Sequence, residues 1–140
     1  MKLQLIGFTP HLEEIVATAV LTTTAGNTPS RVFKNVSSNS GPSKRLIARL
    51  ELQHGSVFEH NRVNWLLEAT DEEILNLLLK SKFFNLTKLD TGLWLLSANL
   101  RTIIEYVRAE EGLMRDALLA SMKEFAPTVL SVLEREDVKP

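Results

Sequence analysis

Segments with strand periodicity alternate along this chain with segments of helix periodicity, and this order constrains the fold more than any other feature. Apolar and polar residues alternate over 2–8, in RVNWLLE at 62–68 and in TGLWLLSA at 91–98. Such alternation is typical of strands with one buried face. The strands are few and helical segments separate them. We therefore expect a helix-rich domain of the α/β or α+β class, with a small sheet packed against helices.

Helix periodicity marks the segments between and after these strands. From residue 12 to residue 20, apolar side chains recur every three or four positions, and Glu13 and Glu14 suit the first turn of a helix. Capping residues and glycine or proline at the expected ends place the other helices. The expected helices are 12–20, 43–53, one capped by Thr70 or Asp71, and a region from Asn99 onward that Gly112 breaks and Pro127 restarts.

The segment from residue 22 to residue 43 differs in composition from the rest of the chain. It is rich in Thr, Ser, Asn, Gly and Pro, residues that favour turns over regular elements. We therefore expect a long mobile loop over 22–43. With 140 residues, the chain has the length of one domain with a single core, so we expect one domain over 1–140.

Composition excludes several classes of function. The chain has no cysteine, which excludes disulfides, thiolate nucleophiles and zinc sites built on sulfur. Its formal net charge of −1 gives no basic excess for nucleic acid. No apolar run approaches the ~20 residues that cross a bilayer, and the N-terminal segment lacks the apolar core of a signal peptide. We expect a cytoplasmic protein that binds neither nucleic acid nor membranes.

Chemically capable side chains gather between His54 and His60, in the sequence HGSVFEH. These histidines are six positions apart across an expected turn, whereas a helical zinc pair needs histidines four positions apart. Ser56 lacks the G-x-S-x-G setting of a hydrolase nucleophile. The residues alone favour a turn at Gly55 that leads into a strand, with hydrogen-bonded histidines. Metal binding stays open as an alternative.

The same segment resembles a motif of the flavin-dependent thymidylate synthases, H-x-S/T-x-x-E-H, which ends a helix and precedes an alternating strand. Here HGSVFEH is followed by NRVNWLLE. Two further stretches also resemble segments of this family, in the same order along the chain. MKLQLIGFTPHLEEIVATAV resembles the family's first strand and helix, and GLWLLSANLRTIIEYV resembles its strand that leads into an N-x-R pattern. The resemblance covers most of the chain.

This resemblance implies a fold, an activity and a site. Members of the family methylate dUMP to dTMP with methylenetetrahydrofolate, NADPH and FAD, and the usual assembly is a homotetramer with active sites between subunits. We therefore expect a homo-oligomer that binds FAD and a nucleotide. The cofactor-binding residues that the resemblance implies are His54, Ser56, Glu59, Asn99 and Arg101.

The chain departs from the family where the family carries arginines. The family signature, R-H-R with spaced serines and an arginine, is replaced over 77–90, and its triplet corresponds to LKS at 79–81. No arginine lies between Arg62 and Arg101. Lysine supplies charge without the bidentate fork of arginine. The candidate substrate-binding residues of this segment are Lys80, Lys82 and Lys88.

Further departures concern a catalytic arginine and chain length. The family's arginine beyond N-x-R aligns with Glu110, or with Arg108 if the alignment slips, and Leu21 stands near the usual arginine of the first helix. The long insertion before the N-x-R strand is absent. We therefore expect a short, degenerate member that makes no dTMP unaided. The alternatives are an enzyme with an altered substrate or a shared site, and a non-catalytic scaffold or protein-interaction module.

Overall fold

The computed structural model describes residues 1–49 and 55–138. Within these ranges the chain forms a four-stranded sheet, seven α-helices and one short 3-10 helix, η1. None of the described helices is long and apolar enough to cross a membrane. The elements are β1 (Lys2–Phe8), α1 (Leu12–Ala25), α2 (Pro29–Ser38), α3 (Ser40–Arg49), η1 (Gly55–Phe58), β2 (Val63–Glu68), α4 (Asp71–Lys80), β3 (Asn85–Asp90), β4 (Leu93–Ala98), α5 (Leu100–Ala109), α6 (Leu113–Phe125) and α7 (Pro127–Val138).

The sheet has the strand order β1-β2-β4-β3, and every neighbouring pair is antiparallel. The expected small sheet with many helices is confirmed. Because antiparallel strands need no crossover helix between them, the fold is of the α+β class rather than the α/β class. Val63 at the start of β2 lies opposite Ala98 at the end of β4. The segments that precede β2 and follow β4 therefore meet at one end of the sheet.

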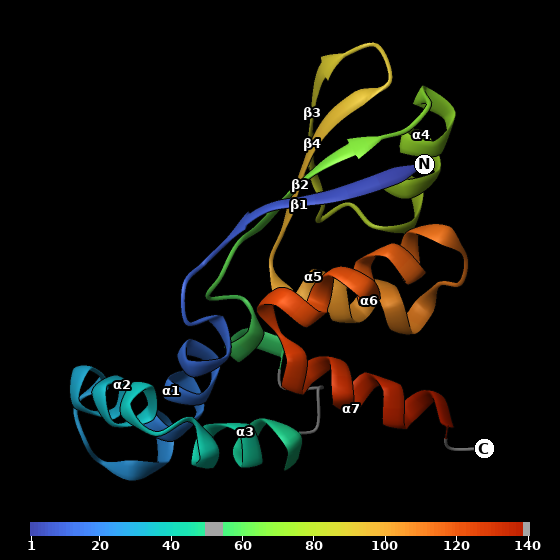
Figure 1. Ribbon diagram of the computed structural model, residues 1–140. Helices are drawn as coiled ribbons and strands as arrows, with labels where there is room; N and C mark the ends of the chain where they lie inside the picture. Colours follow the sequence, from blue (N-terminus) through green and yellow to red (C-terminus); the bar gives the residue numbers. More distant parts are fainter. Residues whose placement is uncertain (50–54, 139–140) are drawn as a thin grey trace.

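The core fills the space between one face of the sheet and the helices α5 and α6 (Figure 1), and it also includes buried residues of the other five helices. Val63, Trp65 and Leu67 of β2 are buried, whereas Asn64 and Leu66 between them are only half-buried. This is the alternation that the sequence predicts for a strand with one buried face.

Most of the segment 22–43 is helical in the structure, so the prediction of a long loop is wrong. α1 extends to Ala25, Gly26 ends it with a left-handed φ of 67°, and α2 and α3 follow. Val32, Val36 and Ile47 of these two helices are buried in the core, and α3 packs against α1 and α7. Their burial outweighs the weak helix propensity of the Ser, Thr and Asn residues around them. The predicted helix end at residue 53 lies outside the described residues.

The sequence pattern also fails to predict β3. Of its side chains only Leu86 is half-buried, and the others are exposed, so the segment carries almost no apolar signal. Its backbone pairs with β4 across a turn at Thr91 and Gly92, where Gly92 has a φ of 72°. The segment over 77–90 that departs from the family pattern thus contains the end of α4 and the edge strand of the sheet.

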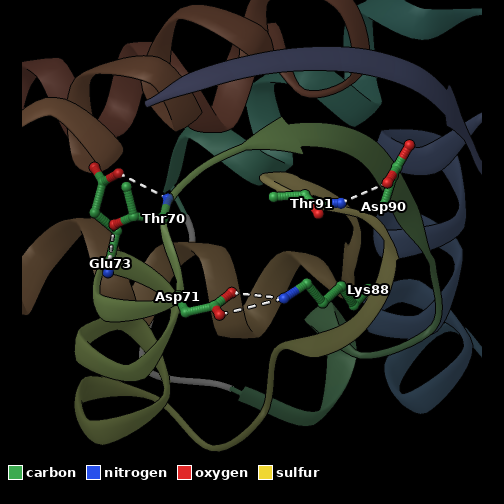
Figure 2. Close-up of polar contacts among 6 residues, drawn as sticks. All are labelled: Thr70, Asp71, Glu73, Lys88, Asp90 and Thr91. Atoms are coloured by element: carbon green, nitrogen blue, oxygen red, sulfur yellow. Dashed lines mark hydrogen bonds and ion pairs between the residues drawn. The ribbon is translucent and has the colours of Figure 1, made fainter.

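The predicted helix starts at Thr70, Asn99 and Pro127 are confirmed, whereas the helix expected from Ser43 begins at Ser40. Thr70 and Glu73 form a reciprocal capping box at the start of α4 (Figure 2), as the spacing of these residues predicts. Asn99 caps α5, Gly112 with a φ of 108° separates α5 from α6, and Pro127 is the first residue of α7. These boundaries depend on local chemistry, which explains why the sequence alone locates them.

Candidate functional site

Two distant segments of the chain are joined where β2 begins and β4 ends. The side-chain oxygen Oδ1 of Asn61 accepts a hydrogen bond of 2.7 Å from the backbone N–H of Leu100, the first residue of α5. Its amide Nδ2 donates to the carbonyl of Phe58 at 2.9 Å. One asparagine therefore holds the end of η1 against the first turn of α5.

A network of charged groups lies beside this junction. Asn99 caps α5 by accepting a hydrogen bond from the N–H of Thr102 at 2.9 Å. Arg101 donates through Nη1 to Glu59 at 2.7 Å and through Nε to Glu105 at 3.1 Å. The hydrogen bond to Glu59, and to a smaller extent the one to Glu105, raises the pKa of Arg101. Glu59 and Arg101 come from different motifs of the sequence, 42 positions apart.

Gly55 makes room for this arginine. A Cβ atom added at Gly55 would lie 2.5 Å from Cζ of Arg101, a distance far below van der Waals contact. Any other residue at this position would therefore push the guanidinium group away from Glu59. The glycine of the HGSVFEH segment has a packing role at Arg101, which the sequence alone did not indicate.

A cleft of about 410 Å³ opens beside the network. Its walls come from the η1–β2 connection, the α4–β3 connection and the first turns of α5, and its volume is within the range of small-molecule sites. Arg62, Lys82 and Arg101 bring positive charge to it, and Glu59 and Glu105 bring negative charge. Within residues 1–49 and 55–138, the side chains of Arg62 and Lys82 form no ion pair. These two cations can accept an anionic group without breaking an existing ion pair.

The cleft brings together three of the five residues that the resemblance assigns to the cofactor, namely Glu59, Asn99 and Arg101. Ser56 is exposed on η1 but does not line the cleft. His54 lies outside the described residues. No group of three or more His, Asp or Glu side chains that could hold a metal ion occurs in the described part of the chain.

The three candidate substrate lysines lie in different places. Lys82 lines the cleft. Lys80 forms an ion pair of 3.1 Å with Glu110 in a second groove, of about 460 Å³, between α4 and α5. Lys88 forms an ion pair of 3.0 Å with Asp71 at the start of α4, as Figure 2 shows, and its ammonium lies over the ring of Trp94. Of the three, the cleft therefore contains only Lys82.

The two positions that align with the family's catalytic arginine both form ion pairs outside the cleft. Glu110 ends α5, and its hydrogen bond with Lys80 raises the pKa of that lysine. Arg108 donates from Nη2 and Nε to the two carboxylate oxygens of Glu136 in α7, at 2.6 Å and 3.0 Å. Neither side chain lines the cleft beside Arg101.

Several cleft residues were not predicted. Glu105 follows Arg101 by four positions on one helix, a spacing that favours an ion pair and that could have identified it. Arg62 and Phe83 carried no such signal, because they reach the cleft only through the order of the strands.

No known protein-family model and no curated protein matches this chain.

Proposed function

We propose that this chain is a short relative of the flavin-dependent thymidylate synthases that keeps a cleft for a flavin or nucleotide and does not make dTMP on its own. The observation that carries the proposal is the convergence of Glu59, Asn99 and Arg101 on one cleft. These residues come from two stretches that resemble the family's motifs, and the resemblance assigns them to the cofactor.

The residues of the cleft fit part of an FAD molecule. Arg62 and Lys82 offer cationic donors for a phosphate group, and the amide Nδ2 of Asn99 is a further donor because its oxygen caps α5. About 410 Å³ is near the lower end of the range for ligand sites, so it suits one ring system or one phosphate and ribose. The rest of FAD needs a wall from a second chain. A bound flavin would supply hydride transfer, while these side chains bind and orient it.

Loss of the methylation activity is supported by the ion pair between Lys80 and Glu110. Lys80 stands in the triplet that replaces R-H-R, and Glu110 aligns with the later catalytic arginine. An anionic substrate such as dUMP would need cations at both positions. Here the two groups neutralise each other at 3.1 Å, so the groove between α4 and α5 gives a phosphate little net attraction.

The proposal is tested by titrating the purified protein with FAD and dUMP, and by assaying tritium release from labelled dUMP. We expect saturable flavin binding, and no release in the presence of FAD, NADPH and methylenetetrahydrofolate. Lys82→Gln should weaken flavin binding, whereas Lys88→Gln, at a lysine outside the cleft, should not. Sustained tritium release would show that the activity is retained. Absence of flavin and nucleotide binding would remove the assignment of the cleft.

Gly55→Ala provides a sharper test of the arginine. The new methyl group should displace the flexible guanidinium of Arg101 rather than the backbone, so we expect the free energy of unfolding to change by less than about 1 kcal/mol. Flavin affinity should fall about tenfold, or about 1.4 kcal/mol. Thermal unfolding and fluorescence titration measure the two quantities. Gly7→Ala is the matched control because a Cβ atom there meets no atom within 4 Å. Unchanged affinity in Gly55→Ala would show that Arg101 takes no part in binding.

A non-catalytic interaction module is the second candidate, and the surface of α4 favours it. Leu79 of α4 and Phe83 beyond its end are exposed by 76% and 59%, and both line the second groove together with Leu78. Exposed apolar side chains that lie together are typical of protein-binding surfaces. A colourless protein that binds neither flavin nor dUMP, yet forms a defined complex, would favour this candidate.

A further inference from the structure

The cleft and the second groove meet at the α4–β3 connection. Lys82, Phe83 and Glu105 line both hollows, so these side chains form the border between them. Phe84 holds the connection in the core, since it is buried and its ring meets that of Tyr106 edge-on, with centroids 5.5 Å apart. Phe83 beside it stays exposed. One ligand can therefore reach from the cleft past the ring of Phe83 into the groove.

The groove offers an apolar surface that the fold leaves uncovered. Leu78, Leu79 and Phe83 are exposed, and all three line it. Tyr106 and Ala109 of α5 complete its apolar lining. Covering such a surface with an apolar group is favourable because apolar area leaves water, whereas a polar group there would lose its hydration. The groove therefore suits an apolar chain or ring.

The charged groups around the two hollows favour a ligand with a single negative charge. Four cations and three carboxylates line the cleft and the groove together. All three carboxylates form ion pairs, with Arg101 or with Lys80. Arg62 and Lys82 form no ion pair within residues 1–49 and 55–138. The excess of one positive charge matches a carboxylate more closely than a doubly charged phosphate ester.

We propose that the cleft and the groove together bind an apolar monocarboxylate, with its carboxylate at Arg62 and Lys82 and its chain along Phe83 into the groove. Guanidinium and ammonium groups both donate charge-assisted hydrogen bonds to a carboxylate. The inference goes beyond the proposed function, because the flavin or nucleotide is assigned to the cleft alone. Both ligands use Arg62 and Lys82, so we expect them to compete.

The first test is calorimetric titration of the purified protein with hexanoate, octanoate and decanoate at pH 7. Each added methylene should strengthen binding about twofold to threefold, because it buries further apolar surface in the groove. Octanol keeps the chain of octanoate and lacks its charge, so it should bind about tenfold more weakly. Affinity that is independent of chain length, or equal for octanol and octanoate, would overturn the proposal.

Single substitutions test the two ends of the site separately. Lys82→Gln should weaken decanoate binding about tenfold through the carboxylate, and Leu79→Ser about fivefold through the chain. The matched controls are Lys123→Gln on α6 and Leu75→Ser, which is 57% exposed on α4 and does not line the groove. Both should bind decanoate like the wild type. All four side chains are exposed, so we expect each variant to fold. Equal losses in Leu79→Ser and Leu75→Ser would contradict a chain in the groove.

Flavin titration of Leu79→Ser distinguishes this proposal from that of the cleft, because Leu79 does not line the cleft. We expect the FAD affinity of this variant to stay at the wild-type level while its decanoate affinity falls. A wild-type chain that binds decanoate but neither FAD nor dUMP would remove the proposed function and support the carboxylate site. A chain that binds FAD but no decanoate would overturn the carboxylate site alone.

Discussion

Replacing Trp65 by alanine should lower the free energy of unfolding by about 3–5 kcal/mol, the range for loss of a fully buried large aromatic side chain. Trp65 is 0% exposed in β2, a central strand of the sheet. Its ring meets that of Phe125 in α6 edge-on, with centroids 6.1 Å apart. Its indole N–H donates to the hydroxyl of Ser121 at 3.2 Å. The substitution would open a cavity where the sheet meets α6.

Chemical denaturation followed by circular dichroism measures this loss. Trp65→Phe keeps an aromatic ring and gives up the indole N–H, so we expect a smaller loss of about 1–2 kcal/mol. Leu66→Ala is the control on the same strand, because this side chain is half-buried on the opposite face. We expect it to cost about 1 kcal/mol or less. Equal losses in Leu66→Ala and Trp65→Ala would contradict a core on one face of the sheet.

Replacing Glu13 by alanine should lower the free energy of unfolding by about 2 kcal/mol. This carboxylate of α1 is 8% exposed, and its Oε2 accepts hydrogen bonds of 3.0 Å from the N–H groups of both Thr128 and Val129. It thereby caps the first turn of α7 from a helix more than a hundred residues earlier. Alanine would leave two amide groups without an acceptor in a poorly hydrated place. Thermal and chemical denaturation at pH 7 measure the loss.

Glu13 should also make stability depend on pH. Burial raises the pKa of Glu13 above the ordinary value of 4.5, and the hydrogen bonds from Val129 and Thr128 oppose that shift only in part. The folded protein therefore holds this proton to a higher pH than the unfolded chain does. The resulting stabilisation is fully present below about pH 4.5 and is lost as the pH rises through the raised pKa.

Glu13→Gln isolates this dependence. Its amide oxygen can accept both hydrogen bonds without a buried charge, so the variant should gain stability relative to the wild type as the pH rises from 4.5 to 7. The difference between the two denaturation midpoints removes the contribution of other carboxylates. A difference that stays constant over this range would mean that Glu13 titrates alike in the folded and unfolded states.

Two elements show where prediction from sequence fails. α2 has a composition typical of loops, and it is helical because Val32 and Val36 pack into the core. β3 is a strand because β4 offers it hydrogen bonds, although its side chains are mostly exposed. In both cases the stabilising groups lie in distant parts of the chain, so no local pattern could contain the signal.

The candidate site divides in the same way. The sequence marks Glu59, Asn99 and Arg101 as polar residues of two separate motifs, but spacing along the chain cannot say that they meet. Lys80 and Lys88 seemed equivalent to Lys82 in sequence. The fold engages the first with Glu110 and the second with Asp71, and leaves the third at the cleft.

The sequence by itself determined the elements whose causes are local. The alternation of apolar and polar residues predicted which face of β2 is buried. Thr70, Asn99 and Gly112 set the helix boundaries through capping and backbone conformation. The tertiary structure alone decided which side chains share a cleft. The antiparallel pairing of β2 with β4 brings Glu59 within 2.7 Å of Arg101. That proximity depends on strand order, because strand order fixes which chain segments meet at an end of the sheet.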